Sequence, residues 1–228
     1  MTSSKKITVL LAEDHAIVRQ GLCGLLKADG SFLIVGEART GRDAVALART
    51  LQPDVILMDI AMPVLNGLEA TRQIMTANPA ARILILSAHS DDVYVERMQQ
   101  AGAAGFLEKQ TSAEILTKAI GEVAAGRTYF SPAISKRLAA TVAKPRDRDG
   151  MVRANGNRLT PRESEVLQLV AEGSANKQIA AELGISIKTV EKHRQHLMDK
   201  LDIHDTASLT RHAISTGVIE NVVQLTIV

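Results

Sequence analysis

The sequence predicts two domains of different class: an α/β domain built on a doubly wound, five-stranded parallel sheet, followed by a small all-α domain of four helices. Five short apolar runs alternate with five segments of helical periodicity, which predicts the first domain. The runs are nearly unbroken, as expected of strands buried on both faces. Two of the four later helices are joined by Gly184-Ile185-Ser186, which is typical of a helix-turn-helix.

The elements of the first domain follow from these patterns. The strands are expected at Ile7–Ala12, Phe32–Ala38, Val55–Asp59, Ile83–Ser87 and Ala104–Leu107. The helices are expected at Ala16–Ala28, Arg42–Leu51, Gly67–Ala77, Asp92–Ala101 and Ala113–Ala125. Thr111 and Glu114 stand at the spacing of a capping box for the last of these helices.

Composition narrows the class of protein. Apolar residues make up 46% of the chain, enough for packed cores, and no apolar run approaches the roughly 18 residues of a membrane span. Cys23 is the only cysteine, so no internal disulfide can form, and its apolar neighbours on the first helix favour a packing role. A reduced, cytoplasmic location without membrane contact is therefore expected.

Charge divides the chain into three segments. Residues 1–126 carry 12 Lys and Arg against 14 Asp and Glu, a net −2; residues 127–157 carry 7 against 2, or +5; residues 158–228 carry 8 against 9, or −1. We expect a first domain over residues 5–126, a connector over 127–157 and a second domain over 158–220. Ser131-Pro132 predicts a short helix in the connector, and its charged, Gly- and Asn-rich remainder predicts a flexible tether.

Polar side chains stand at the ends of four predicted strands. Glu13-Asp14 follow the first strand, Asp59 ends the third, Ser87 ends the fourth and Lys109 follows the fifth. Ligands of open parallel sheets bind at this edge. Three carboxylates in one crevice repel one another, so the site calls for a cation, and Mg²⁺ suits carboxylate oxygens. Ser87 can donate a hydrogen bond to a phosphoryl oxygen, and Lys109 can offset the charge of the phosphoryl group. Asp59 is then a nucleophile that forms an acyl phosphate. Each residue alone is as easily a solvated loop residue; the joint pattern carries the prediction.

Four motifs of the first domain carry a family resemblance: Leu11–His15, Leu57–Pro63 with Asn66-Gly67, Leu86–Ala88 and Ala101–Lys109. With them the domain resembles the flavodoxin-like receiver domain of bacterial two-component response regulators. The resemblance implies that Asp59 accepts a phosphoryl group from a sensor histidine kinase, and that Glu13, Asp14, Asp59 and the backbone carbonyl of Ala61 hold Mg²⁺. It also implies a switch in which Ser87 moves toward the phosphate and Phe106 follows. Gln110 stands where the family often has proline, so no cis peptide bond is expected there.

The third helix of the second domain has two faces. Val190, Leu197 and Leu201 recur at spacings of seven and four and are expected to pack inward. The opposite, polar face carries Lys188, Glu191, Lys192, Gln195 and Asp199. In a helix-turn-helix this face enters the major groove of DNA, where Lys192 could read guanine, Gln195 adenine and Glu191 cytosine. The side chains expected to contact phosphates are Lys177, Lys188, Thr189, His193, Arg194 and Lys200.

A second resemblance is carried by Leu159–Glu163, Ala171–Gly173, Asn176–Ala180, Leu183–Ser186 and Lys188–His193. These motifs are similar to the LuxR-type DNA-binding domain of the NarL/FixJ class of response regulators. The resemblance implies that the fourth helix, Thr206–Ser215, forms a dimer contact on DNA, with Leu209 and Ile214 as candidates. A role of both residues in the core of their own domain is at least as consistent with their apolar character.

These patterns predict a phosphorylation-controlled, DNA-binding transcriptional regulator whose only chemistry is its own phosphorylation and dephosphorylation. The expected partners are a histidine kinase, promoter DNA and a second copy of the chain when phosphorylated or DNA-bound, with RNA polymerase as a further candidate. Two rivals stay open: a hydrolase, which would need a second carboxylate where Ala61 stands, and a regulator whose receiver docks partners without phosphorylation. The sequence leaves two effects of phosphorylation open: release of the DNA-binding domain and dimerisation.

Overall fold

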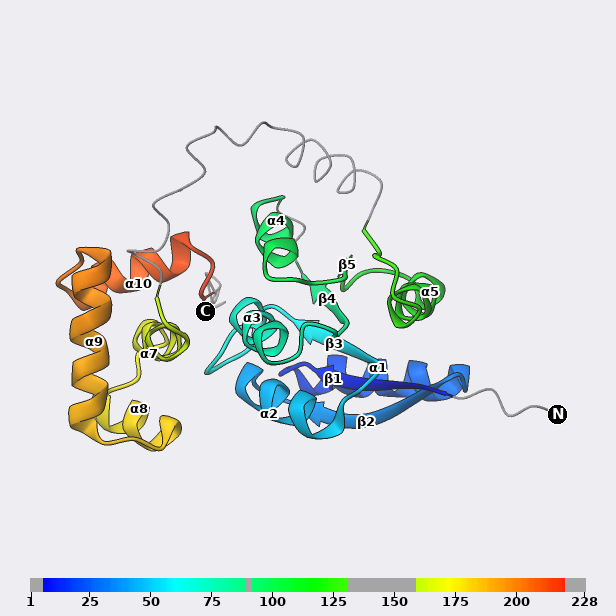
Figure 1. The fold of residues 1–228 in the computed structure, drawn as a ribbon, viewed down its shortest axis with the longest axis horizontal. Coiled ribbons are helices and arrows are strands. Elements are labelled where there is room, and N and C mark those ends of the chain that lie inside the picture. The colour runs from blue at the N-terminus through cyan, green and yellow to red at the C-terminus, as the bar shows by residue number, and fades with distance from the viewer. Residues whose placement is uncertain (1–5, 89–91, 131–158, 220–228) are drawn as a thin grey trace, which may run out of the picture. The chain divides into compact units, whose positions relative to one another are not determined.

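The computed structural model describes residues 6–88, 92–130 and 159–219. The chain divides into two compact units, residues 1–146 and 147–228, and each is described by itself (Figure 1). The short helix and the tether predicted within the connector lie outside the described residues. Within the described residues, no helix is long and apolar enough to cross a membrane.

In the described residues of the first unit, a five-stranded parallel sheet is flanked by five helices, which confirms the predicted fold class (Figure 1). The strands are β1 (Ile7–Ala12), β2 (Phe32–Ala38), β3 (Val55–Asp59), β4 (Ile83–Ser87) and β5 (Gly105–Glu108). The helices are α1 (Ala16–Asp29), α2 (Gly41–Leu51), α3 (Gly67–Ala77), α4 (Asp92–Gln100) and α5 (Ala113–Ala124). The strand order is β2-β1-β3-β4-β5, so the chain order reverses between β1 and β3, the point at which open parallel sheets bind ligands beyond the carboxyl ends of their strands.

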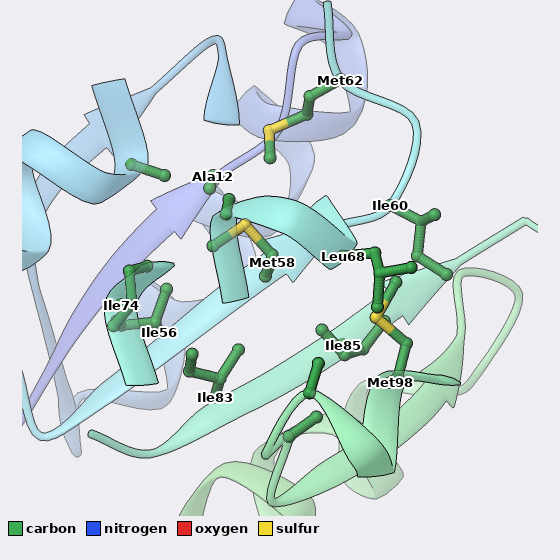
Figure 2. Packing of buried hydrophobic residues seen from close by; sticks show 14 of the residues in the cluster. Ala12, Ile56, Met58, Ile60, Met62, Leu68, Ile74, Ile83, Ile85 and Met98 are labelled. Atoms are coloured by element: carbon green, nitrogen blue, oxygen red, sulfur yellow. The ribbon is translucent and has the colours of Figure 1, made fainter. Parts of the chain in front are cut away.

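Alternate residues of the central strands face opposite layers of helices. In β3, Ile56 and Met58 belong to a cluster with buried residues of α2, α3 and α4, whereas Leu57 belongs to a cluster with α1 and α5. Figure 2 shows the first cluster, including Ile74 of α3 and Met98 of α4. Because both faces of each central strand are buried, the strands read as unbroken apolar runs.

α5 begins at Ala113, as predicted, but its N-cap differs from the prediction by one residue. The N-cap is Ser112, whose hydroxyl accepts a hydrogen bond from the backbone N–H of Ile115 at 3.4 Å. The predicted capping box of Thr111 and Glu114 is therefore wrong. Both residues 111 and 112 have a side-chain hydroxyl, and the extended backbone at Ser112 decides which of them faces the first turn.

The chain returns to the sheet after α5. The N–H of Tyr129 donates to the carbonyl oxygen of Ala104 at 2.9 Å, and the N–H of Phe106 donates to the carbonyl oxygen of Tyr129 at 3.0 Å. A Cβ on Gly105 would lie 2.7 Å from that same Tyr129 oxygen, so this position favours glycine. The first unit thus continues past residue 126, into residues that the sequence assigned to the connector.

A polar contact ties β1 to β3 at their amino ends. The carboxylate oxygen Oδ2 of Asp54 accepts hydrogen bonds from the backbone N–H of Thr8 at 2.8 Å and from its hydroxyl at 2.7 Å. The N–H of Asp54 in turn donates to Oγ1 of Thr8 at 2.9 Å. This contact lies at the amino ends of the strands, whereas the candidate site lies at their carboxyl ends.

The described part of the second unit, residues 159–219, forms the predicted set of four helices. They are α7 (Pro161–Ala171), α8 (Asn176–Leu183), α9 (Ile187–Leu201) and α10 (Thr206–Ser215). Thr160 and Glu163 form a capping box at the start of α7. Gly184 ends α8 with a φ of 62°, a left-handed conformation that suits glycine and makes the tight turn into α9. Val190 and Leu197 of α9 are fully buried, as predicted.

Candidate functional site

The structure brings the strand-end residues together at the carboxyl edge of the sheet. Glu13 and Asp14 follow β1, Asp59 ends β3, and Ser87 ends β4. Lys109 follows β5, and its ammonium nitrogen lies 2.9 Å from Oε2 of Glu13 and 2.9 Å from Oδ2 of Asp59. The side chains of Glu13 and Asp59 are only 1% and 2% exposed. Two buried carboxylates therefore share one cation.

Burial and neighbouring charges set the protonation of these groups. Burial raises the pKa of Asp59 to about 6; the Lys109 ammonium acts to lower it, and the Glu13 carboxylate raises it further. Burial acts to lower the pKa of Lys109, but the carboxylates of Asp59 and Glu13 outweigh burial and raise it. Lys109 is thus a fixed positive charge at neutral pH, whereas Asp59 can gain or lose a proton near neutrality.

Two glycines allow close backbone contacts with Asp59 and with the loop that follows β3. A Cβ on Gly67, the first residue of α3, would lie 2.0 Å from the backbone oxygen of Asp59. Gly67 also donates its N–H to the carbonyl oxygen of Ile60 at 2.8 Å. A Cβ on Gly41 would lie 2.0 Å from the backbone oxygen of Leu65, whose carbonyl accepts the Gly41 N–H at 3.0 Å. No side chain fits at either position unless this backbone moves.

Ser87 and Phe106 lie on paired strands. Phe106 is opposite Ile85 in the register of β4 and β5, two residues before Ser87. Both side chains are buried, and Phe106 belongs to the core cluster on the face of α2, α3 and α4. The backbone N–H of Lys109 donates to the carbonyl oxygen of Ser87 at 2.7 Å, which fixes the lysine backbone beside the end of β4.

Arg19 of α1 contacts the acidic loop, and the sequence interpretation missed it. Its side chain is 7% exposed, and Nη1 donates to the backbone oxygens of Glu13 at 2.8 Å and Asp14 at 3.1 Å. Its Nε lies 3.3 Å from Oε2 of Glu37 on β2. Arg19 shares the buried face of α1 with Cys23 and Leu26, at spacings of four and three. A charged residue on an apolar helix face was the signal in the sequence.

The acidic cluster has the ligand chemistry of a metal site. Glu13, Asp14, His15 and Asp59 each offer one ligand atom, and these atoms lie within 4.8 Å of one another. Three carboxylates face one lysine, so the cluster carries excess negative charge, and carboxylate oxygens suit a hard divalent cation. His15 is 65% exposed, and its Nδ1 lies 2.9 Å from Oδ1 of Asp14. The residues therefore fit Mg²⁺.

In the second unit, the polar face of α9 is exposed, as predicted. The exposed side chains are those of Lys188, Glu191, Lys192, Gln195 and Asp199, and Lys177 of α8 is exposed as well. Gln195 donates from Nε2 to Oδ1 of Asp199 at 2.8 Å, an i,i+4 contact that a base could replace. His193 is half-buried on the side of this face.

Three residues that were expected to contact phosphates have partners inside the unit. Lys200 donates from Nζ to Oε2 of the buried Glu163 at 2.6 Å. Arg194 donates to Oδ1 of Asn176 at 2.8 Å and to Oγ1 of Thr206 at 3.2 Å, which links α9 to the first turns of α8 and α10. The hydroxyl of Thr189 lies 2.8 Å from that of the N-cap Ser186.

The candidate dimer residues also differ in exposure. Leu209 is fully buried in the second unit, so the structure favours its alternative role in the intradomain core over a dimer contact. Ile214 is half-buried and keeps part of its surface available.

Comparison with known proteins identifies the family. Residues 9–121 match the response regulator receiver domain, and residues 157–213 match the bacterial regulatory proteins of the luxR family. The chain is 36% identical over 222 residues to the transcriptional regulatory protein MctR of Rhizobium johnstonii, covering 97% of this chain and 100% of MctR. The chain belongs to the LuxR family of response regulators. It is a DNA-binding transcriptional regulator of the two-component type, as predicted.

Solved structures support the same assignment for this response regulator. A LuxR-family two-component response regulator from Aurantimonas aligns with a TM-score of 0.56 and 34% identity over 60% of this chain and 98% of that one. RcsB from Salmonella enterica serovar Typhimurium, bound to the promoter rprA with the phosphomimetic BeF3−, aligns with a TM-score of 0.52 and 26% identity over 91% and 98%. The family consists of transcription factors, so the hydrolase interpretation is set aside.

Proposed function

We propose that Asp59 accepts a phosphoryl group from the phosphohistidine of a sensor histidine kinase. The observation that carries the proposal is a buried carboxylate 2.9 Å from the Lys109 ammonium. In the transfer, an Asp59 oxygen bonds to phosphorus, the phosphorus–nitrogen bond of the donor breaks, and the imidazole leaves. With a pKa of about 6, Asp59 is ionised in most molecules at neutral pH, as a nucleophile must be.

The remaining residues of the site support this transfer. Glu13, Asp14, Asp59 and the backbone carbonyl of Ala61 would hold Mg²⁺, which when bound neutralises negative charge on the carboxylates and the phosphoryl group. Lys109 offsets the charge that the acyl phosphate adds, and the Ser87 hydroxyl donates to a phosphoryl oxygen. Ser87 moves toward the phosphoryl group, and the Phe106 ring follows it within the core in which it is already buried. Phosphorylation shifts the receiver only by stabilising this arrangement more than the other.

The output of the switch is DNA binding by α9. RcsB, a relative in this family, is solved as two dimers bound to two parallel DNAs. We propose that this chain also binds promoter DNA as a dimer, with Lys192, Gln195 and Glu191 contacting base edges. Two α9 helices would then read half-sites about one helical turn apart. The exposure of all three side chains supports this assignment.

The proposal is tested with acetyl phosphate and Mg²⁺, followed by mass spectrometry of the intact chain. The wild type should gain one phosphoryl group, and Asp59→Ala should gain none. Asp54→Asn, which keeps an acceptor oxygen for Thr8 on the loop before the same strand, is the matched control and should be modified like the wild type. A modified Asp59→Ala chain would contradict the proposal.

A receiver that docks partners without phosphorylation remains the second candidate. It is distinguished by titrating promoter DNA with phosphorylated and unphosphorylated protein while the dimer fraction is measured by sedimentation. We expect phosphorylation to tighten binding and to raise the dimer fraction. Equal binding and equal dimer fractions in both states would favour docking.

A further inference from the structure

We infer that Arg19 is a positioning residue for the metal and phosphoryl site: its guanidinium fixes the backbone of Glu13 and Asp14 so that their carboxylates face Asp59. The inference rests on the proposed function in that it takes Mg²⁺ as the ion held there. It adds a residue that lies outside the acidic cluster and on the buried face of α1.

The contacts of Arg19 converge on two consecutive peptide groups. Nη1 lies 2.8 Å from the Glu13 oxygen and 3.1 Å from the Asp14 oxygen, so a single nitrogen holds both carbonyls on one side of the loop. The side chains of Glu13 and Asp14 leave the same short stretch of backbone. A rotation of either peptide plane would therefore move a carboxylate away from the other ligand atoms, which now lie within 4.8 Å of one another.

The guanidinium is itself fixed from two directions. It is nearly buried at 7% exposure, which limits its rotamers, and its Nε ion-pairs with Glu37 of β2 at 3.3 Å. The next residue of β2, Ala38, accepts the backbone N–H of Glu13 at 3.0 Å. The backbone N–H of Glu13 is thus held by the end of β2, and its carbonyl oxygen is held by Arg19. Because Glu37 is 48% exposed, we expect its ion pair to contribute less than the two carbonyl contacts.

A purely structural role for Arg19 would have a different signature. If Arg19 only joined α1 to the sheet, its removal would lower the melting temperature but leave the Mg²⁺ affinity of the folded protein unchanged. Thr8→Val supplies this comparison, because it removes hydrogen bonds of a partly buried polar group at the amino ends of the strands. It should destabilise the receiver without altering the acidic loop.

The experiment measures Mg²⁺ binding to the full-length chain by calorimetry, with melting followed by circular dichroism. Arg19→Met should weaken Mg²⁺ binding about 10-fold, as is usual when a group that orients metal ligands is removed. Arg19→Lys, which can reach fewer acceptors, should fall between Arg19→Met and the wild type, and Glu37→Gln should show a smaller loss. Thr8→Val should melt earlier and bind Mg²⁺ like the wild type.

A second readout separates positioning from chemistry. The rate of phosphorylation by acetyl phosphate should need more Mg²⁺ in Arg19→Met but approach the wild-type rate at saturating Mg²⁺, since Asp59 and Lys109 are unchanged. Wild-type Mg²⁺ affinity in Arg19→Met, or equal weakening in Thr8→Val, would overturn the inference. Should Arg19→Met fail to fold, wild-type affinity in both Arg19→Lys and Glu37→Gln would do so. A wild-type chain that binds no Mg²⁺ would overturn the proposed metal site as well, which distinguishes the two failures.

Discussion

Lys109 and Lys192 are both expected to meet phosphate or DNA, yet their surroundings are opposite. Lys109 is 17% exposed, and two buried carboxylates lie within 2.9 Å of its ammonium. Lys192 is exposed on α9, where its partner is expected to be a base from outside the protein. In the receiver site, Lys109 already has charged partners inside the protein, whereas the polar face of α9 is open to solvent. Changes in the receiver site should therefore alter chemistry and protonation, whereas changes on the exposed face of α9 should alter only the complex with DNA.

The largest effect is expected at Lys109. Lys109→Met removes the cation that faces the charge developing on the phosphoryl group, and we expect the rate of phosphorylation by acetyl phosphate to fall about 100-fold. A time course of intact mass measures this rate. Lys118→Met, which removes an exposed lysine of α5, is the control and should react like the wild type. An unchanged rate in Lys109→Met would remove the distinction between the buried and the exposed lysines.

Lys200 tests whether a lysine of the second unit can behave like one of the receiver. Lys200→Met leaves the carboxylate of Glu163, which is 4% exposed, without its ion-pair partner, and we expect a loss of about 2 kcal/mol in the stability of this unit. Hydrogen exchange of the α7 amides reports this loss in the full chain. Lys192→Met should leave the exchange unchanged. Equal protection in both variants would show that the Lys200–Glu163 contact contributes little.

A substitution of Lys192 tests the same comparison through its effect on DNA binding. Lys192→Ala should weaken binding about tenfold and relax specificity at one base position, because an exposed side chain that reads a base contributes only in the complex. Lys200→Met should instead weaken all sequences alike. Titration of a site and its single-base variants separates these outcomes. Identical profiles for the two variants would contradict a base-reading role for Lys192.

The two units should also respond to pH in opposite directions. Burial raises the pKa of Asp59 from 3.8 to about 6. The stability that the protonated carboxyl contributes to the folded receiver is therefore fully present below pH 3.8 and is lost as pH rises through about 6. Carbon-13 NMR of the metal-free protein should show the Asp59 carboxyl titrating near pH 6. Lys109→Met should raise this midpoint, because the ammonium acts to lower it. A midpoint near 4 would contradict the burial argument.

The pH dependence of stability at Glu163 has the opposite sign to that at Asp59, and it is the smallest effect that we expect. Burial acts to raise its pKa, but hydrogen bonds from Lys200 and Thr160 outweigh burial and lower it. Its contribution to stability is therefore present above the ordinary glutamate pKa and is lost as pH falls through the lowered value. Protection factors of the α7 amides, which correct for the pH dependence of intrinsic exchange, should fall in the wild type as pH drops below the ordinary glutamate pKa. This fall should be smaller in Lys200→Met, and an equal fall would argue against the ion pair as its cause.

The sequence predicts the receiver site well because parallel strands leave no choice about which ends meet. Once β1, β3, β4 and β5 are recognised, Glu13, Asp59 and Lys109 must share an edge. The role of Arg19 was not predicted because its contacts with the acidic loop are made to backbone oxygens, which the sequence does not display. In the second unit, spacing placed Lys188 and Lys192 on the open face correctly. It could not show that Lys200 meets Glu163 of α7 or that Leu209 is enclosed, since both depend on how separate helices pack.

The backbone contact between Phe106 and Tyr129 joins the aromatic switch candidate to the segment that follows α5. The peptide group of the aromatic switch candidate donates directly to the strand-like residue through which the polypeptide leaves the sheet. A displacement of the Phe106 backbone would therefore act directly on Tyr129, because this hydrogen bond joins the two residues.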